Sequence, residues 1–167
     1  MDALFTRTSV RRFTDEAVTE EQAELLMRAG MAAPSAGNQQ PWVFYLTRDK
    51  EMLARLASCS QYASPLRGAA LGIVVCAQKS KLRFADMVVQ DLSAATENIL
   101  IEAAALGLGA VWMGVAPDAE RMRVVAEAIG NPEDSEPFAL IAVGHPEKAP
   151  EPRGPKNYNP ERIHWLS

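Results

Sequence analysis

The sequence predicts a single domain in which helices and strands alternate along the chain. Its 167 residues, 48% of them apolar, are near the usual size of one domain and suffice for a buried core. Two patterns carry this expectation: short apolar runs of strand length, and longer segments whose apolar residues recur every three or four positions. The chain has no internal repeat and no linker that would divide it, so we expect one domain over residues 1–167.

The predicted strands are four apolar runs. "LGIVVCA", residues 71–77, is apolar on both of its faces, which is typical of a central strand that is covered on both sides of a sheet. The sequence predicts three further strands. Those three strands are expected within residues 43–47, 107–115 and 138–144.

Capping residues and apolar periodicity predict the helices. Thr19 and Gln22 form a capping-box pattern at the start of a helix that we expect to stop at Gly30. Residues 86–106 predict a helix about 30 Å long at 1.5 Å per residue, which would form the spine of the fold. Its apolar stripe is Val88, Leu92, Ala95, Ile99, Ala103 and Leu106, and shorter helices are expected at residues 50–58 and 118–130, the latter capped by Asp118 and stopped by Gly130.

Composition excludes several classes of function. Seventeen Lys and Arg residues against 21 Asp and Glu residues give a net charge of -4, so no nucleic-acid partner is expected. No apolar run is long enough for a membrane span or a signal peptide, which predicts a cytoplasmic protein. Cys59 and Cys76 lack the spacing partners of a disulfide framework or a metal site. Asp91 and Glu97 are expected on solvated helix faces or at dimer contacts rather than in a metal site.

The segment "RTSVRRF", residues 7–13, is the first candidate site. In an extended chain Arg7, Ser9 and Arg11 would point to one side, away from the residues between them. Two guanidinium groups beside a hydroxyl suit a phosphate, because Arg supplies paired donors that match phosphate oxygens. A solvated basic turn would have the same composition, so both interpretations stay open.

The segment "APSAGNQQPW", residues 33–42, is the second candidate site. Ser35, Asn38, Gln39 and Gln40 supply both donors and acceptors within six residues. Amide side chains can pair with the polar edge of a heterocycle such as a flavin or a purine. A loop from a helix to a strand would use the same residue types to cap its backbone, so this alternative also stays open.

Taken together and in this order, four segments resemble the nitroreductase-like flavoproteins, a family that binds FMN. "RTSVRRF" is similar to the family's arginine-x-serine-x-arginine signature, and "APSAGNQQPW" to its polar loop before a proline and an aromatic residue. Residues 90–114 resemble its central helix and the following strand, and "GHPEKAPEPR", residues 144–153, its last strand and tail. The resemblance spans nearly the whole chain.

The resemblance implies an α+β fold, with a central mixed or antiparallel sheet flanked by helices, in an intimate homodimer. Each FMN would lie at the interface and contact both subunits, and residues 148–167 would form an extended tail on the partner subunit. The cofactor-binding residues implied are Arg7, Thr8, Ser9 and Arg11 for the phosphate, ribityl chain and pyrimidine edge, Pro34, Ser35, Ala36, Asn38 and Gln39 or Gln40 from the partner chain, Trp112, Met113 and Gly114 along the ring, and Gly144, His145 and Arg153 at the phosphate end.

By the same resemblance the chain would be an FMN-dependent oxidoreductase. NADH or NADPH would reduce the flavin at N5, and nitroaromatics, quinones or related small acceptors would reoxidise it in a ping-pong reaction, without a catalytic side chain or a metal. Arg11 would stabilise the anionic reduced flavin. Two alternatives keep the fold: a protein that stores, senses or modifies flavin without general reductase activity, and a dimer without cofactor. Glu151 departs from the family, which often has a basic residue two positions before the one matched by Arg153.

Overall fold

A four-stranded sheet forms the middle layer of the chain, whose structure is a computed structural model that describes residues 3–151 and 158–166. The strand order is β1-β2-β4-β3, and each neighbouring pair is antiparallel. The expectation of an α+β fold with a sheet flanked by helices is therefore confirmed, and the sheet is antiparallel rather than mixed. Its strands are β1 (Trp42–Thr47), β2 (Leu71–Gln78), β3 (Gly109–Gly114) and β4 (Ser135–Gly144).

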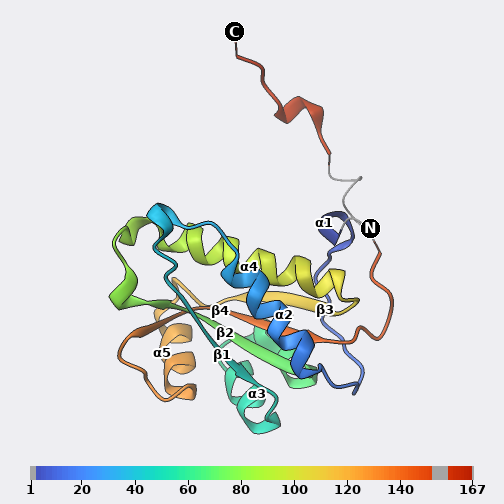
Figure 1. Cartoon of the computed structure of the whole chain (residues 1–167). Coiled ribbons are helices and arrows are strands. Elements are labelled where there is room, and N and C mark those ends of the chain that lie inside the picture. Colours follow the sequence, from blue (N-terminus) through green and yellow to red (C-terminus); the bar gives the residue numbers. More distant parts are fainter. Residues whose placement is uncertain (1–2, 152–157, 167) are drawn as a thin grey trace.

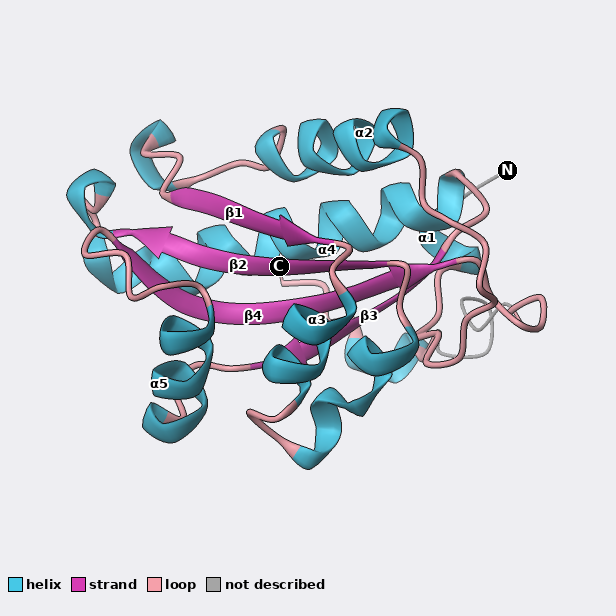
Figure 2. Cartoon of the chain, turned by 90° about the horizontal axis from the view of Figure 1, so that it is seen from below, coloured by secondary structure: helices cyan, strands magenta, loops and turns pink. Residues whose placement is uncertain are grey.

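Helices cover both faces of this sheet (Figure 1). One face carries α2 (Glu20–Met31) and α4 (Val88–Ala105), and the opposite face carries α3 (Lys50–Ala57) and α5 (Ala119–Ala128), as Figure 2 shows from below. The short α1 (Ala3–Thr6) lies near the end of α4. No helix in residues 3–151 or 158–166 is long and apolar enough to cross a membrane.

The central strands supply side chains to two hydrophobic cores. In β2, Ile73 and Val75 pack into the core beneath α2 and α4, whereas Val74 and Cys76 pack into the core beneath α3 and α5. This alternation explains why the whole of the predicted strand is apolar, since each face of β2 meets a helical layer. The predicted stripe of α4 contributes Leu92, Ala95, Ile99 and Ala103 to the first core.

The predicted helix starts are confirmed at α2 and α5. Thr19 Oγ1 accepts from the Gln22 backbone N–H at 3.1 Å, and the Gln22 side chain accepts from the Thr19 N–H at 2.9 Å. Asp118 Oδ1 accepts from the backbone N–H of Arg121 at 3.0 Å. The predicted end of this helix at Gly30 is one residue too early, because α2 continues to Met31. Gly30 is instead buried inside the helix, where it packs against Ile99 of α4.

The long helix begins two residues later than predicted. Residues 85–87 form a 3₁₀ turn, and α4 starts at Val88. The Gln39 side chain bonds both backbone groups of Phe84, accepting from its N–H at 2.9 Å and donating to its carbonyl at 3.2 Å. The Phe84 carbonyl also accepts from the Met87 N–H at 3.0 Å, so the chain before α4 is fixed as a turn rather than as a further helical turn.

We expect Gly109→Ala to loosen the N-terminal segment from β3. A Cβ at Gly109 would lie 2.6 Å from Val10 Cγ1 and 2.7 Å from Val10 Cβ, which forces the two backbones apart. Such overpacking lowers the free energy of unfolding by about 1–3 kcal/mol, measurable by urea denaturation. Gly68→Ala is the matched control, because a Cβ there meets nothing within 4 Å. Equal stability of the two variants would contradict the close approach of Val10 to β3.

Candidate functional site

The N-terminal segment runs along the edge of β3. Ser9 forms a parallel bridge with Ala110, and the Val10 N–H donates to the Ala110 carbonyl at 3.0 Å. Because β3 pairs with β4 on its other side, this segment occupies the edge that the sheet leaves open. The first predicted cluster is therefore held by backbone bonds beside one of the strands that the resemblance places in the site.

A cavity of about 260 Å³, here called the N-terminal cavity, lies where this segment meets the chain after β4. The Glu147 N–H donates to the Arg12 carbonyl at 3.2 Å, and Phe13 pairs with Pro146, so the two segments are joined. Lys148 is a further cation at this cavity, and no motif in the sequence indicated it. The cavity is lined by Thr8, Ser9, Val10, Arg11, Arg12, Glu147, Lys148 and Pro150.

Arg7 lies apart from this cavity. Its Nε is 2.9 Å from Oε1 of Glu97 on α4, and both side chains are partly exposed. Arg7 and Thr8 line a different, largely apolar cavity of about 580 Å³ between α1, the end of α4 and the start of β3. The structure thus brings Ser9 and Arg11 together but directs Arg7 to α4, where Glu97 makes an ion pair rather than facing solvent alone.

A third cavity, here called the strand-end cavity, measures about 360 Å³ and adjoins the end of β3. Trp112, Met113, Gly114 and Arg11 all line it, so four of the predicted site residues come together. Trp112 also packs against Phe138, with ring centroids 5.8 Å apart and planes at 53°. The remaining lining comes from residues 59–65, Val111 and Arg121.

Arg121 also lines the strand-end cavity, and no motif in the sequence indicated it. Its Nη1 donates to the Gly114 carbonyl at 3.3 Å, and its Nε lies 3.3 Å from Asp118 Oδ2. Its guanidinium carbon is 6.0 Å from the centroid of the Tyr62 ring, which lines the same cavity. The only signal in the sequence is its place three residues after the predicted cap Asp118, which puts it in the first turn of α5.

A buried polar network holds the loop of residues 33–42. Gln39 is 5% exposed and Asp91 is 4% exposed. Gln39 Nε2 donates to Asp91 Oδ2 at 2.7 Å, and the Ala36 N–H donates to Asp91 Oδ1 at 2.9 Å. The expectation of a solvated or interfacial Asp91 is wrong, because its two oxygens satisfy buried donors of the loop. Gln39 is likewise committed to Asp91 and Phe84.

The same loop leaves other polar side chains outside. Asn38 and Gln40 are exposed, and their φ angles of 53° and 48° lie in the left-handed region. Such backbone costs roughly 1–3 kcal/mol for residues other than glycine, and it gathers at binding sites. Ser35 Oγ accepts from the Gln40 N–H at 3.0 Å and so helps to hold the turn, while Pro34 is exposed.

The two predicted clusters lie at opposite ends of α4 (Figure 1). Asp91, in the first turn of α4, bonds Ala36, whereas Ser9 pairs with Ala110, which follows the end of the helix. The stretch of α4 from residue 91 to residue 105 measures about 20 Å at 1.5 Å per residue. No residue of the loop 33–42 lines either of the two cavities that Arg11 lines.

The predicted contacts from the end of β4 are not at these cavities. Gly144 packs against Phe13, whose Cβ would be 3.0 Å from a Cβ at position 144. His145 Nε2 lies 3.5 Å from Glu16 Oε1. Among the described residues, neither lines the N-terminal or the strand-end cavity. Arg153 lies outside the described residues.

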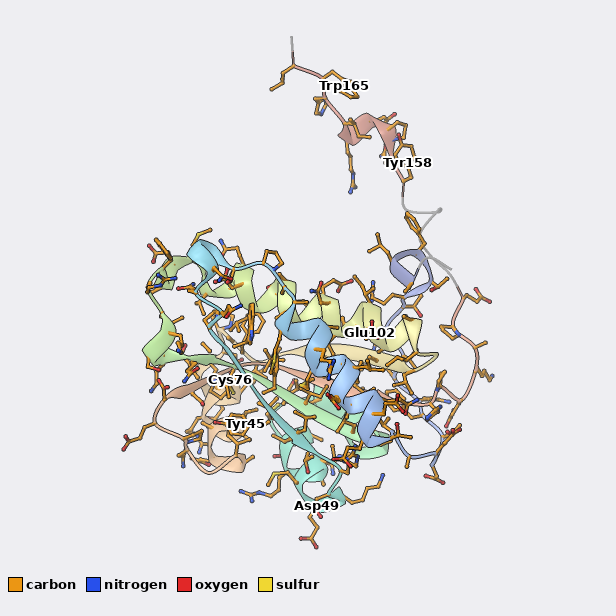
Figure 3. The ribbon with its side chains drawn as sticks, viewed as in Figure 1. Tyr45, Asp49, Cys76, Glu102, Tyr158 and Trp165 are labelled. Carbon is orange, nitrogen blue, oxygen red and sulfur yellow. The ribbon has the colours of Figure 1, made fainter. Side chains whose placement is uncertain are left out.

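We expect Asp91→Asn to loosen the loop of residues 33–42. Whichever way the new amide faces, its NH₂ meets either the Ala36 N–H or the Gln39 amide donor, so one buried bond is lost. The expected cost is about 1–3 kcal/mol of unfolding free energy, with faster hydrogen exchange at Ala36. Glu102→Gln, on the same helix (Figure 3), removes the same charge and is the control. Unchanged exchange at Ala36 would contradict the anchoring role of Asp91.

Comparisons with known proteins agree with the geometry. The model of the nitroreductase family matches residues 4–61 and 58–145. A candidate NADH dehydrogenase/NAD(P)H nitroreductase of Archaeoglobus fulgidus is 42% identical over 163 residues, which cover 96% of this chain and 94% of that protein.

Solved structures show the same likeness. A candidate NADH oxidase of Clostridium acetobutylicum is 42% identical in sequence, and its crystal structure matches with a TM-score of 0.93 over 98% of both chains. A candidate nitroreductase of Desulfovibrio desulfuricans, solved in complex with FMN, is 35% identical, with a TM-score of 0.78 over 89% of this chain and 87% of that one. The resemblance read from the sequence is thus confirmed, and this chain belongs to the nitroreductase family.

Proposed function

We propose that the chain is an FMN-dependent oxidoreductase that takes electrons from NADH or NADPH and passes them to small acceptors such as nitroaromatics or quinones. The observation that carries this proposal is the position of Arg11, which lines both the N-terminal and the strand-end cavity. Two adjoining cavities suit a molecule with a phosphate at one end and a planar heterocycle at the other. The FMN-bound relative from Desulfovibrio desulfuricans supports the same ligand.

The donors around each cavity fit the two ends of FMN. At the N-terminal cavity, Ser9, Arg11 and Lys148 supply a hydroxyl and two cations for a phosphate. At the strand-end cavity, the end of β3 from Trp112 to Gly114 forms part of the lining, so a ring would lie along this strand. Bound FMN would supply the redox chemistry, taking a hydride from the nicotinamide, which leaves as NAD(P)⁺, and passing two electrons to the acceptor in a separate ping-pong step.

We further propose that two copies of the chain assemble, with the loop of residues 33–42 of each completing the site of the other. The separation of the two clusters along α4 favours this arrangement. The tail offers a second argument, since Tyr158, Trp165 and Leu166 are 69%, 94% and 96% exposed on a segment that projects from the body (Figure 3). Large apolar side chains gathered on a projecting segment mark a surface that packs on a partner. In this proposal residues 1–167 are one domain whose tail, from residue 148, packs on the second copy.

The colour of the purified protein tests this function. We expect a yellow protein that binds FMN and is bleached by NADH or NADPH without oxygen, and that nitroaromatics, quinones or free flavins then reoxidise. A colourless protein that takes up no added FMN would contradict the proposal. A yellow protein that neither nicotinamide bleaches would instead identify a protein that stores, senses or modifies flavin.

We expect Arg11→Ala to weaken FMN binding far more than Arg12→Ala. Arg11 lines both cavities, whereas Arg12 lines only the N-terminal cavity and its carbonyl is bonded by Glu147. Loss of a hydrogen bond to a charged group costs about 1.5–3 kcal/mol, or roughly 10- to 100-fold in the dissociation constant. Quenching of flavin fluorescence measures it. Equal losses in the two variants would argue against the central place of Arg11.

We expect Asn38→Gly to reduce FMN content without unfolding the chain, because glycine keeps the left-handed backbone while the amide is lost. Asn131→Gly is the matched control, since Asn131 also has a positive φ, of 50°, and lies before β4.

Mixed dimers of Arg11→Ala and Asn38→Gly chains test directly whether the two subunits share each site. If each site draws on both subunits, one of the two sites carries neither change, and half of the wild-type FMN content returns. Mixed dimers as empty as the parents would rule out shared sites.

A further inference from the structure

The proposed function leaves unused a charged residue of the strand-end cavity, Arg121 of α5, and its partner Asp118, which caps that helix and does not itself line the cavity. Arg121 lines the cavity, as does Arg11, but the two differ in how they are held. Arg11 is exposed, and its one hydrogen bond within the described residues is a long contact of 3.5 Å to the Ser9 carbonyl. Arg121 is half-buried and has three partners, which restrict where its charge can lie.

Those partners come from separate parts of the fold. The carbonyl of Gly114 at the end of β3, the Tyr62 ring and the Asp118 carboxylate each contact the guanidinium group. Asp118 is itself fixed, because its Oδ1 accepts from the backbone N–H groups of Glu120 and Arg121 at 3.1 and 3.0 Å. Within the described part of the chain, Nη2 of Arg121 has no hydrogen-bond partner and is free to donate to a ligand.

The pKa of the Cys59 thiol depends on the charges of both Arg121 and Asp118. Cys59 lines the strand-end cavity, and partial burial raises the pKa of its thiol. Arg121 opposes this shift and lowers the pKa of Cys59, whereas Asp118 raises it. A negative charge in this cavity is therefore favoured by Arg121 and opposed by Asp118.

We propose that Arg121 and Asp118 form a charge pair that sets how much negative charge a ligand ring can carry in the strand-end cavity. The ligand rests on the proposed function: it is the flavin ring, whose pyrimidine half becomes negative when the flavin is reduced. Arg121 stabilises that negative charge and Asp118 destabilises it. The balance of the two effects therefore sets the stability of the reduced, negatively charged flavin, in addition to the effect of Arg11.

Sulfite measures this effect without turnover. It forms a sulfur–nitrogen bond at flavin N5 with its own lone pair, and the displaced electron pair becomes negative charge on the pyrimidine half of the ring. In the FMN-loaded protein we expect Arg121→Gln to weaken sulfite binding about tenfold, as for the loss of one nearby charge at a half-buried position. Asp118→Asn should strengthen it, because Asn keeps the helix cap while the carboxylate charge is lost.

The opposite signs separate electrostatics from a merely structural role, since damage to packing would shift both variants in the same direction. Arg123→Gln is the control on the same helix, because Arg123 is paired with Glu120 and Glu127 away from the cavity. The flavin midpoint potential should fall in Arg121→Gln and rise in Asp118→Asn. A tenfold difference between the affinities of the oxidised and the reduced flavin corresponds to about 30 mV for a two-electron couple.

Three outcomes overturn the inference, and they are distinguishable. A wild-type protein that takes up no FMN removes the proposed function and this inference with it. Normal FMN uptake with unchanged sulfite affinity in both variants, or with shifts of the same sign, removes the inference alone. The third outcome is measured on the cofactor-free protein, by the pH dependence of Cys59 alkylation. Arg121→Gln should raise the pKa of Cys59, and Asp118→Asn should lower it. An unchanged pKa of Cys59 in both variants would show that the charge pair does not act on the cavity. Cys76 is fully buried and does not compete for the reagent.

Discussion

Helix α4 lies across one face of the sheet with Leu92, Ala95, Ile99 and Ala103 buried, and its polar residues hold both candidate clusters. Near its start, Asp91 accepts the donors of the loop of residues 33–42, and in its middle Glu97 pairs with Arg7. Because a helix is rigid, the stretch of about 20 Å from Asp91 to the end of α4 fixes the distance between the loop and the start of β3, where Ser9 pairs with Ala110. This fixed separation is the reason for the proposal that a second copy completes each site.

Local patterns in the sequence were sufficient to predict the four strands and α2 to α5, whereas α1 and the 3₁₀ helix of residues 61–68 were not predicted. The capping box at Thr19, the cap at Asp118 and the fully apolar strand β2 depend on residues that are neighbours in the chain, so a single sequence contains the whole signal. Motif resemblance likewise indicated the two clusters, since each lies within ten residues or fewer. What these patterns could not show was how residues distant in sequence combine.

The roles that were missed or wrong all depend on such distant contacts. Asp91 reads as a surface residue of an amphipathic helix, and only its bonds to Ala36 and Gln39, more than 50 positions away, account for its burial. Lys148 joins the N-terminal cavity because Phe13 pairs with Pro146. Arg121 reaches the strand-end cavity because α5 begins just after β3 ends. The positions of Asp91 and Lys148 follow from the packing alone, whereas Arg121 has one local signal, its place three residues after the cap Asp118.

Net charge is a poor guide to the sites of this chain for the same reason. The chain carries a net charge of -4, yet the lining of its N-terminal cavity holds three cations, Arg11, Arg12 and Lys148, against the single carboxylate of Glu147. In the strand-end cavity the guanidinium of Arg121 is held in a fixed direction by a carboxylate and a carbonyl. The field that a ligand meets is set by such short, fixed contacts, while the surface charges that dominate the total are screened by salt beyond about 10 Å.

The loop of residues 33–42 combines strained backbone with buried hydrogen bonds. Asn38 and Gln40 hold left-handed backbone at a cost to the isolated chain, and the buried bonds of Asp91 and Gln39 keep the loop in that form before any ligand arrives. A loop that is already ordered loses little conformational entropy on binding, which would favour the contact with a ligand of the second copy in the proposed dimer. The bonds of Asp91 and Gln39 therefore offset the strain within one chain, and in the proposed dimer the exposed side chains of Asn38 and Gln40 would make the contact with the second copy.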